Sequence, residues 1–240
     1  MERALMKELR RWKASPRRKP LVLKGARQVG KTWLMKELGR QCYAKTAYVN
    51  FDRNPRMKQV FDQDLDIERI LMAINLETGV RVTPHDTLII FDEVQEAPRA
   101  ISAFKYFCED APEYHIVVAG SLLGVALHAG VSFPVGKVQT MRLFPMDFEE
   151  FLMAMGEDQL LKLMHSKDYA LMNAFHEKLK DYLRQYYYVG GMPEVVKMYM
   201  ENKLLGQVDQ MKREMVQIKQ QRQEVALSAL REEPAVAADT

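Results

Sequence analysis

The residues best suited to chemistry form a glycine-rich octet near the start of the chain. Its members are Gly25, Ala26, Arg27, Gln28, Val29, Gly30, Lys31 and Thr32. They complete the GxxxxGK[ST] pattern of a phosphate-binding loop, in which glycines let successive backbone N–H groups point at phosphate oxygens. The octet follows an apolar run and opens a helical stretch, so the positive end of a helix faces the same anion. It predicts a nucleoside triphosphate site in which Lys31 reaches the β- and γ-phosphates and Thr32 binds Mg²⁺.

A second signal is the pair of acids Asp92 and Glu93, which ends the apolar run 88–91. A carboxylate at the carboxyl end of a strand can hold Mg²⁺ beside the phosphates, and the next acid can deprotonate the attacking water. Acids after a strand also serve as ordinary caps. The distance from Lys31 leaves room for one intervening strand, which favours Asp92 as the metal-side acid and Glu93 as the general base.

Weaker candidates surround these two motifs. Ser121 follows the next apolar run, where it could contact the γ-phosphate or simply mark a turn. Arg27 either braces a phosphate or forms a surface pair. Arg142 and Arg184 could sense the γ-phosphate, although ordinary surface arginines are the favoured interpretation. Asp52 ends another predicted strand at the same edge of the sheet and could orient the residues that contact the ligand.

Other catalytic classes find no support in the sequence. No paired zinc-ligand spacing occurs among the five histidines, His85, His115, His128, His165 and His176. No GxSxG pattern marks a serine nucleophile. The two cysteines, Cys42 and Cys108, are far apart and form no CxxC motif, which argues against a disulfide framework and favours a reducing cytosol.

The strands and helices that must position these residues are predicted to form an α/β domain. Near-continuous apolar strands are predicted at 21–23, 46–51, 87–91, 115–119 and 138–143. Helical stretches are predicted at 2–13, 32–38, 56–77 and 98–110. Buried strands that alternate with helices indicate a parallel sheet covered on both faces. We therefore expect residues 1–143 to form the nucleotide-binding core.

The pattern changes after Pro145 to helices alone. Asp147 and Glu150 form a capping box ahead of a helical stripe, and a helical run with a gap near Ser166 continues through 158–188. Gly190-Gly191 ends that run and Pro193 starts another helix. Residues 144–205 are thus predicted to form a small helical domain, and 206–240 a polar helix with a frayed tail. The polar helix carries a thin apolar stripe of Val208, Met211, Met215 and Ile218.

The composition and the distribution of charge indicate which binding partners the chain could have. The chain has 240 residues and a net charge of +3, but nine basic and two acidic residues fall within residues 1–24. A solvated helix face is the favoured interpretation, with contact to phosphates or nucleic acid as the weaker alternative. Tyr186, Tyr187 and Tyr188 could stack on bases, but packing of two rings is favoured over that role. With no secretory leader and no apolar run long enough to span a membrane, we expect a soluble, cytoplasmic protein.

The same residues carry a resemblance to a known family. Lys19 to Thr32, Phe91 to Gln95, Ala119 to Ser121, Leu143 to Phe151 and Tyr188 to Glu194 are the matching segments. They resemble a bacterial and archaeal family of AAA-superfamily ATP-binding proteins that carry a C-terminal domain of unknown function. The resemblance implies a P-loop core of the additional-strand, catalytic-glutamate type, with strand order 5-1-4-3-2 and a helical lid. It also implies Mg²⁺ and ATP as ligands, Lys31 and Thr32 as contacts, Asp92 as metal acid, Glu93 as base and Ser121 as sensor.

This chain departs from the family pattern after about Ile218, where it becomes polar and then ends. We therefore expect a shortened C-terminus, low intrinsic ATPase activity, and an apolar stripe that docks on the lid or self-associates.

The expected function is a Mg²⁺-dependent ATPase that acts as a conformational switch. One alternative is a nucleotide-binding module with little hydrolysis. Another is a small-molecule or nucleoside kinase, which Glu93 and the absence of an arginine-rich lid in 120–140 disfavour. ATP is preferred over GTP because of the resemblance, and no Asn-Lys-x-Asp guanine motif occurs.

Overall fold

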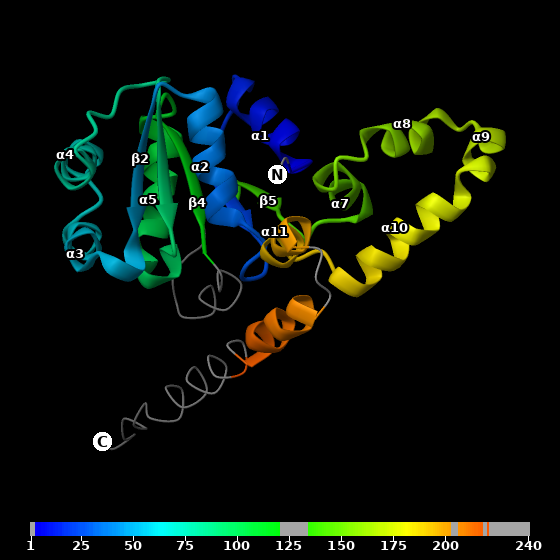
Figure 1. Cartoon of the computed structure of the whole chain (residues 1–240). Helices are drawn as coiled ribbons and strands as arrows, with labels where there is room; N and C mark the ends of the chain where they lie inside the picture. Colours follow the sequence, from blue (N-terminus) through cyan, green and yellow to red (C-terminus); the bar gives the residue numbers. More distant parts are fainter. Residues whose placement is uncertain (1–2, 121–133, 203–205, 218–219, 221–240) are drawn as a thin grey trace, which may run out of the picture. The chain divides into compact units, whose positions relative to one another are not determined.

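The computed structural model describes residues 3–120, 134–202, 206–217 and 220 (Figure 1). The chain divides into two compact units, Met1–Glu150 and Phe151–Thr240. The division falls later than the predicted boundary at 143, because the segment after the last strand bonds back to the first unit through Glu150.

The first unit is built on a five-stranded sheet whose strands all run parallel. The strands are β1 (Leu21–Lys24), β2 (Lys45–Asn50), β3 (Thr87–Asp92), β4 (His115–Ala119) and β5 (Gln139–Arg142). Their spatial order is β2-β3-β4-β1-β5, which is the predicted order 5-1-4-3-2 counted from the other edge. The predicted α/β fold with a P-loop NTPase sheet is confirmed.

Helices cover both faces of this sheet (Figure 1). They are α1 (Leu5–Ala14), α2 (Lys31–Cys42), α3 (Pro55–Gln63), α4 (Ile67–Thr78) and α5 (Pro98–Asp110), with short 3₁₀ helices η1 (Phe51–Arg53) and η2 (Val94–Glu96). Helices α3, α4 and α5 pack on one face, and α2 packs on the other with α1 beside it. This two-sided cover explains why every residue of β3 and β4 is buried.

The helical stretch predicted over 56–77 contains two helices, α3 and α4, with a short break between them. Asp64 is extended after the end of α3, and the Asp66 carboxylate accepts a hydrogen bond of 2.8 Å from the Arg69 N–H at the start of α4. An aspartate that caps a new helix competes with continuation of the old one. The apolar period runs through both helices, so periodicity alone did not reveal the break.

An aromatic cluster fills the core between the sheet and α3 and α5. The Phe91 ring of β3 lies 5.5 Å from Phe51, 5.7 Å from Phe61 and 6.1 Å from Phe104, measured between ring centroids. Phe91 immediately precedes Asp92. Dense packing of this ring therefore fixes the end of the strand that presents the acidic pair.

The second unit is helical in its described part. It comprises the end of α7 (Phe148–Ala154), then α8 (Asp158–Ser166), α9 (Tyr169–Ala174), α10 (His176–Val189), α11 (Pro193–Asn202) and a helix over 206–217. The predicted capping box is present, since Asp147 Oδ1 accepts from the Glu150 N–H at 2.8 Å. The predicted stop and start are also present, because Gly190 takes a positive φ of 77° after α10 and Pro193 opens α11.

The helix over 206–217 packs within the second unit. Val208 is fully buried, and the Tyr188 hydroxyl donates to the Asp209 carboxylate at 2.6 Å. The Tyr186 ring packs against Phe151, whereas Tyr187 and Tyr188 are both exposed. Ile218 and the predicted frayed tail after it, apart from residue 220, lie outside the described residues. Among the described residues, none of the helices combines the length and apolar composition needed to cross a membrane.

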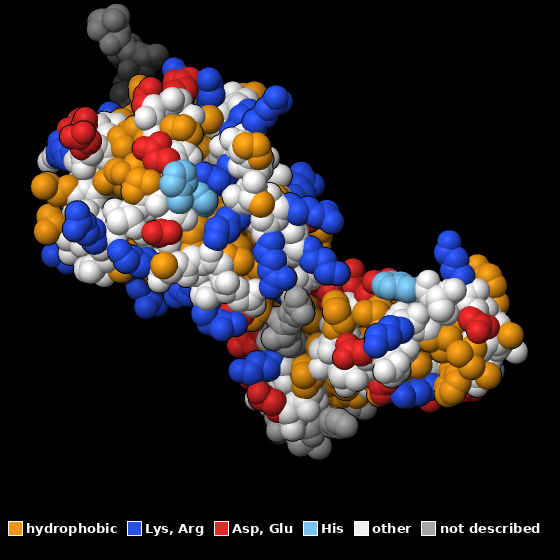
Figure 2. Space-filling view, turned by 90° about the horizontal axis from the view of Figure 1, so that it is seen from above, with side chains coloured by type: hydrophobic (Ala, Val, Ile, Leu, Met, Phe, Trp, Pro, Cys, Tyr) orange, Lys and Arg blue, Asp and Glu red, His pale blue; other side chains and the backbone are white. Residues whose placement is uncertain are grey.

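The basic segment at the start of the chain divides into buried and exposed side chains. Arg18 donates to the carbonyls of Lys13 and Pro112, and Arg3 is buried. The exposed basic side chains of this segment include Lys7, Arg10, Arg11 and Arg17. On the face shown in Figure 2, Lys and Arg side chains are spread among apolar and acidic ones over the first unit. Contact with nucleic acid through these side chains stays a prediction.

A buried histidine lies at the opposite end of the sheet from the acidic pair. His115, the first residue of β4, has its Nδ1 2.7 Å from the Tyr43 hydroxyl, and its Nε2 has no hydrogen-bond partner among the described residues. Burial, together with the nearby positive charges of Arg18, His85 and Lys13, lowers the pKa of His115 to about 3. His115 is therefore neutral in the folded protein at neutral pH.

This burial makes stability depend on pH. The pKa of His115 lies below its ordinary value of 6.5, so the unfolded chain binds a proton as pH falls below 6.5 while the folded chain does not. We expect stability to be lost as pH falls from 6.5 towards 5, with about one proton taken up on unfolding. His115→Asn, which keeps an acceptor for Tyr43, should flatten this dependence in denaturant titrations at several pH values. The exposed His176→Asn is the control, and parallel pH curves for wild type and His115→Asn would contradict the prediction.

Candidate functional site

The octet forms a tight loop between β1 and α2. Gly30 is the residue before α2 and takes a left-handed conformation with φ of 92°, which only glycine adopts at little cost. Gln28 is also left-handed, with φ of 65°. Val29 between them is fully buried. The loop therefore turns sharply around a buried side chain and delivers its last residues into the first turn of α2.

Gly25 is required by a close approach of two backbone segments. A Cβ at this position would lie 2.3 Å from the Leu143 carbonyl oxygen. The Leu143 N–H in turn donates to the Lys24 carbonyl at 2.7 Å, where β1 and β5 end side by side. The start of the loop is thus wedged against the exit of β5.

Lys31 is held inside the loop. The residue is only 8% exposed. Its Nζ donates hydrogen bonds to the backbone carbonyls of Gly25 at 2.8 Å and Ala26 at 2.7 Å. Burial lowers the pKa of Lys31, whereas the carboxylates of Glu93 and Asp92 raise it. An arriving anion would replace the two carbonyls as the partner of this ammonium group.

The Asp92 carboxylate connects β3 to the loop. The residue is 4% exposed, and Oδ2 accepts hydrogen bonds from the Thr32 hydroxyl at 2.7 Å and the Tyr48 hydroxyl at 3.0 Å. Burial, together with the neighbouring Asp92 carboxylate, raises the pKa of Tyr48 to about 12, so Tyr48 remains a donor. The structure thus brings together Thr32 and Asp92, the two residues predicted to contact a metal.

Glu93 lies beside Asp92 in a strained backbone conformation. Its φ of 52° is left-handed although it is not glycine, and such outliers cluster at functional sites. Its Oε2 accepts a hydrogen bond of 2.6 Å from the Gln95 side-chain amide. The other amide atom, Gln95 Oε1, is buried and has no partner among the described residues. Gln95 therefore orients the predicted base.

The remaining predicted residues differ in what the structure says of them. Ser121 lies outside the described residues. Arg142, at the end of β5, is exposed, and Arg27 is exposed within the loop. Arg184 pairs with Asp181 at 3.0 Å on the surface of α10, as an ordinary surface arginine does. Asp52 is exposed in η1 after β2.

Sequence reasoning missed Tyr48 and Gln95. Tyr48 is on β2, and its role follows only from the pairing of β2 with β3, where Tyr48 stands beside Ile90. The predicted strand order already contained that pairing and could have pointed to a side chain near the end of β2. Gln95 was part of a matching family segment but had no chemical role by residue type alone.

The oxygen ligands available here suit Mg²⁺. The Thr32 hydroxyl and the Asp92 carboxylate are hard donors that already lie within hydrogen-bond distance of each other. Among the described residues, no group of three His, Cys, Asp or Glu side chains could cage a metal. Mg²⁺ commonly takes only one or two protein ligands and fills the rest of its shell with water and phosphate oxygens. The donor set therefore fits this ion.

Comparisons with known proteins agree with the fold. A family model described as an AAA domain matches residues 17–152, which include the loop and both acids. Among solved structures, the chain is similar to the Walker-type ATPase of Pyrococcus abyssi, with 16% identity and a TM-score of 0.54 over 96% of this chain and 76% of that one. At this identity the likeness concerns the fold alone.

Two further structures show lower similarity. One is a signal transduction ATPase with numerous domains and a tetratricopeptide repeat sensor from Pyrococcus horikoshii, with 15% identity and a TM-score of 0.45 over 88% of this chain and 32% of that one. The other is the ORC2 protein of Aeropyrum pernix in its ADP form, with 16% identity and a TM-score of 0.37 over 66% of this chain and 51% of that one. No curated protein matches the sequence significantly.

The close approach at Gly25 can be tested by adding one methyl group. Gly25→Ala should destabilise the protein by about 1–3 kcal/mol, because the Cβ must displace the Leu143 backbone or the loop. Thermal unfolding or urea titration measures the loss. Gly206→Ala is the matched control, since a Cβ there meets nothing within 4 Å. Equal loss of stability in both variants would contradict the wedged loop.

Proposed function

Because the chain belongs to the AAA-domain family of ATP-binding ATPases, we propose that it binds ATP with Mg²⁺ and hydrolyses it as a conformational switch. The observation that carries the proposal is the convergence of Lys31, Thr32 and Asp92 at one point. The Thr32–Asp92 hydrogen bond of 2.7 Å joins the loop to the end of β3, and the Lys31 ammonium lies in the same loop. These are the groups that a triphosphate with its metal requires.

In the proposed binding step the loop receives the phosphates. Lys31 exchanges the carbonyls of Gly25 and Ala26 for phosphate oxygens, which are stronger acceptors because they are charged. The backbone N–H groups of the loop and the start of α2 add further donors. The Thr32 hydroxyl and the Asp92 carboxylate would hold Mg²⁺, which when bound neutralises charge on the phosphates.

In the proposed hydrolysis step Glu93 removes a proton from water as the water oxygen bonds to the γ-phosphorus. The bond from that phosphorus to the β–γ bridging oxygen breaks, which leaves ADP and inorganic phosphate. The Gln95 amide keeps the carboxylate in one orientation. Ser121 is proposed as the sensor of the γ-phosphate on the strength of the family resemblance. Residues 144–205 are proposed to form the helical lid. The apolar stripe of Val208, Met211, Met215 and Ile218 is proposed to dock on the lid or to mediate self-association.

The Gln95 contact also favours a second candidate, a nucleotide-binding module with little intrinsic turnover. The hydrogen bond of 2.6 Å from the Gln95 amide occupies Glu93 Oε2, so this oxygen is engaged and does not face an attacking water. Under this alternative ATP is held and hydrolysis waits for Glu93 to be released from Gln95. Turnover by the chain alone separates the two functions.

Loss of the Lys31 ammonium should abolish binding. At a MgATP concentration of 100 times the dissociation constant, wild type should gain about 2.7 kcal/mol in unfolding free energy, and Lys31→Ala should gain none. Lys7→Ala removes the same charge from the exposed face of α1 and should behave as wild type. Thermal shift with and without MgATP makes the measurement, and equal shifts in wild type and Lys31→Ala would refute the proposal.

Glu93→Gln should separate catalysis from binding. The amide keeps the shape of the side chain but cannot accept a proton, so turnover should fall by about 10² to 10⁴ while the dissociation constant for MgATP stays within a factor of about two. Phosphate release and nucleotide titration measure the two quantities. Glu96→Gln is the matched control, because Glu96 is an exposed neighbour paired with Lys58 at 3.4 Å. Loss of binding with unchanged turnover would make Glu93 a structural residue.

A further inference from the structure

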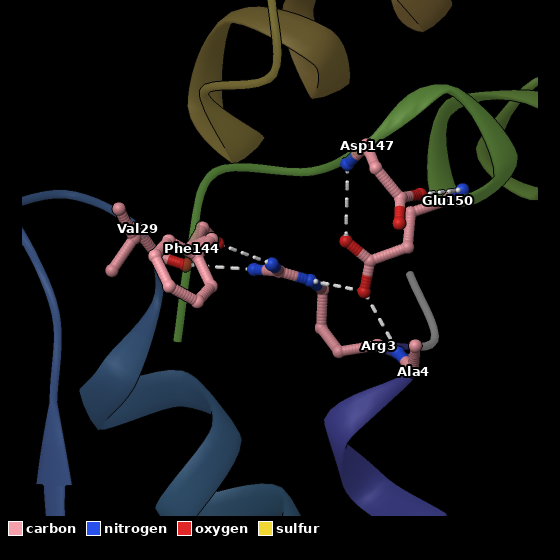
Figure 3. Close-up of polar contacts among 6 residues, drawn as sticks. All are labelled: Arg3, Ala4, Val29, Phe144, Asp147 and Glu150. Atoms are coloured by element: carbon pink, nitrogen blue, oxygen red, sulfur yellow. Dashed lines mark hydrogen bonds and ion pairs between the residues drawn. The ribbon is translucent and has the colours of Figure 1, made fainter. Parts of the chain in front are cut away.

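Arg3 connects three separate segments of the first unit (Figure 3). The residue is 4% exposed. Its Nε donates to Glu150 Oε1 at 2.9 Å, its Nη1 to the Val29 carbonyl at 2.8 Å and its Nη2 to the Phe144 carbonyl at 2.7 Å. One guanidinium group thus bonds to the phosphate loop, to the exit of β5 and to the start of α7.

Glu150 is the acceptor on which the α7 side of this arrangement depends. Besides Arg3, its carboxylate accepts from the Ala4 N–H at 2.7 Å and, through Oε2, from the Asp147 N–H at 3.4 Å. The Asp147 carboxylate accepts from the Glu150 N–H in return. The carboxylate that pairs with Arg3 is therefore also half of the capping box that starts α7.

Stability alone is a poor reason for this pair. A buried ion pair loses its hydration, and apolar side chains of similar volume often serve stability as well or better. What arginine supplies instead is a rigid planar fork with donors in fixed directions. Here that fork fixes the orientation of two backbone carbonyls, one of which belongs to the loop.

The carbonyl of Val29 belongs to the same peptide unit as the N–H of Gly30. A trans peptide is planar, so the N–H points away from the carbonyl. When Arg3 holds the Val29 carbonyl, it therefore directs the Gly30 N–H away from itself. Gly30 directly precedes Lys31 and Thr32 in the loop whose amides must face the phosphates.

We propose that Arg3 is a positioning residue for the nucleotide site: it sets the Val29–Gly30 peptide for phosphate binding and, through Glu150, couples that peptide to the start of α7. This inference rests on the proposed function. Coupling of this kind is reciprocal. Bound nucleotide therefore stabilises the cap of α7 by the same free energy by which the formed cap stabilises nucleotide binding. Helix α7 begins at Phe148 in the first unit and carries the chain past Glu150 into the second.

Arg3→Lys tests the positioning role. Lysine keeps the charge beside Glu150, but one ammonium cannot reproduce a planar fork on two carbonyls. We expect the dissociation constant for MgADP to rise about tenfold or more, as for loss of a hydrogen bond to a charged group. Arg10→Lys is the matched control, because Arg10 is an exposed arginine of α1 bonded to Gln41, and it should bind as wild type. Unchanged affinity in folded Arg3→Lys would overturn the proposal.

Hydrogen exchange tests the coupling, which a merely structural role would not produce. Saturating MgADP should protect the amides of residues 25–32 and 147–150 in wild type, but only those of 25–32 in Arg3→Lys. Equal protection at 147–150 in both proteins would overturn the coupling. If Arg3→Lys does not fold, the double variant Arg3→Met/Glu150→Met replaces the ion pair with apolar side chains and takes its place in both measurements.

The outcomes distinguish this inference from the proposed function. If wild type binds no nucleotide, both fall together. If wild type binds MgADP, Lys31→Ala does not, and Arg3→Lys binds with wild-type affinity, the proposed function stands and the positioning role of Arg3 is wrong.

Discussion

The hydrogen bond between the Thr32 hydroxyl and the Asp92 carboxylate is the interaction on which the candidate site depends. It spans the sheet, because Thr32 follows β1 and Asp92 ends β3, with β4 between these strands. In a parallel sheet all carboxyl ends lie at the same edge, so residues far apart in the sequence meet there. The Glu93 and Asp92 carboxylates attract the nearby Lys31 ammonium and favour the charged form of a side chain that is little exposed to water. Without this convergence the octet would be a glycine turn and the acids would be caps.

The site is held by features that stability alone would not select. Gln28 and Glu93 occupy left-handed conformations that cost free energy in residues other than glycine. Gln95 leaves Oε1 buried without a partner among the described residues, and Lys31 loses hydration on burial. The surrounding core offsets these costs, since Phe91 packs in an aromatic cluster directly before Asp92 and Val29 is fully buried within the loop. Of the left-handed non-glycine residues in the described part of the chain, Gln28 and Glu93 lie at the candidate site, whereas His85 and Lys167 lie elsewhere.

Much of this arrangement could be predicted from local patterns, and what could not is non-local. The octet, the acidic pair, the apolar strands and the capping box of Asp147 and Glu150 each lie within a few residues, so spacing and residue type suffice. The strand order followed from the family resemblance rather than from the residues themselves. The break between α3 and α4 was missed because Asp66 reads equally well as an exposed helical residue or as a cap. Tyr48 depends on a strand pairing, and Gln95 on a left-handed turn at Glu93 that no propensity indicates.

The basic segment shows most clearly why charge counts cannot assign roles. Arg3, Arg10 and Arg18 contribute equally to an excess of positive charge that favours a solvated face. In the structure Arg10 is exposed and bonds to a glutamine, and Arg18 donates to two carbonyls. Arg3 is buried against a glutamate 147 positions later in the chain. The deciding quantity is whether a side chain meets fixed acceptors when the chain folds, and those acceptors are backbone carbonyls whose directions come from the fold. A guanidinium between two such carbonyls transmits geometry as well as charge, which is why a residue that composition treats as surface can bear on the phosphate site.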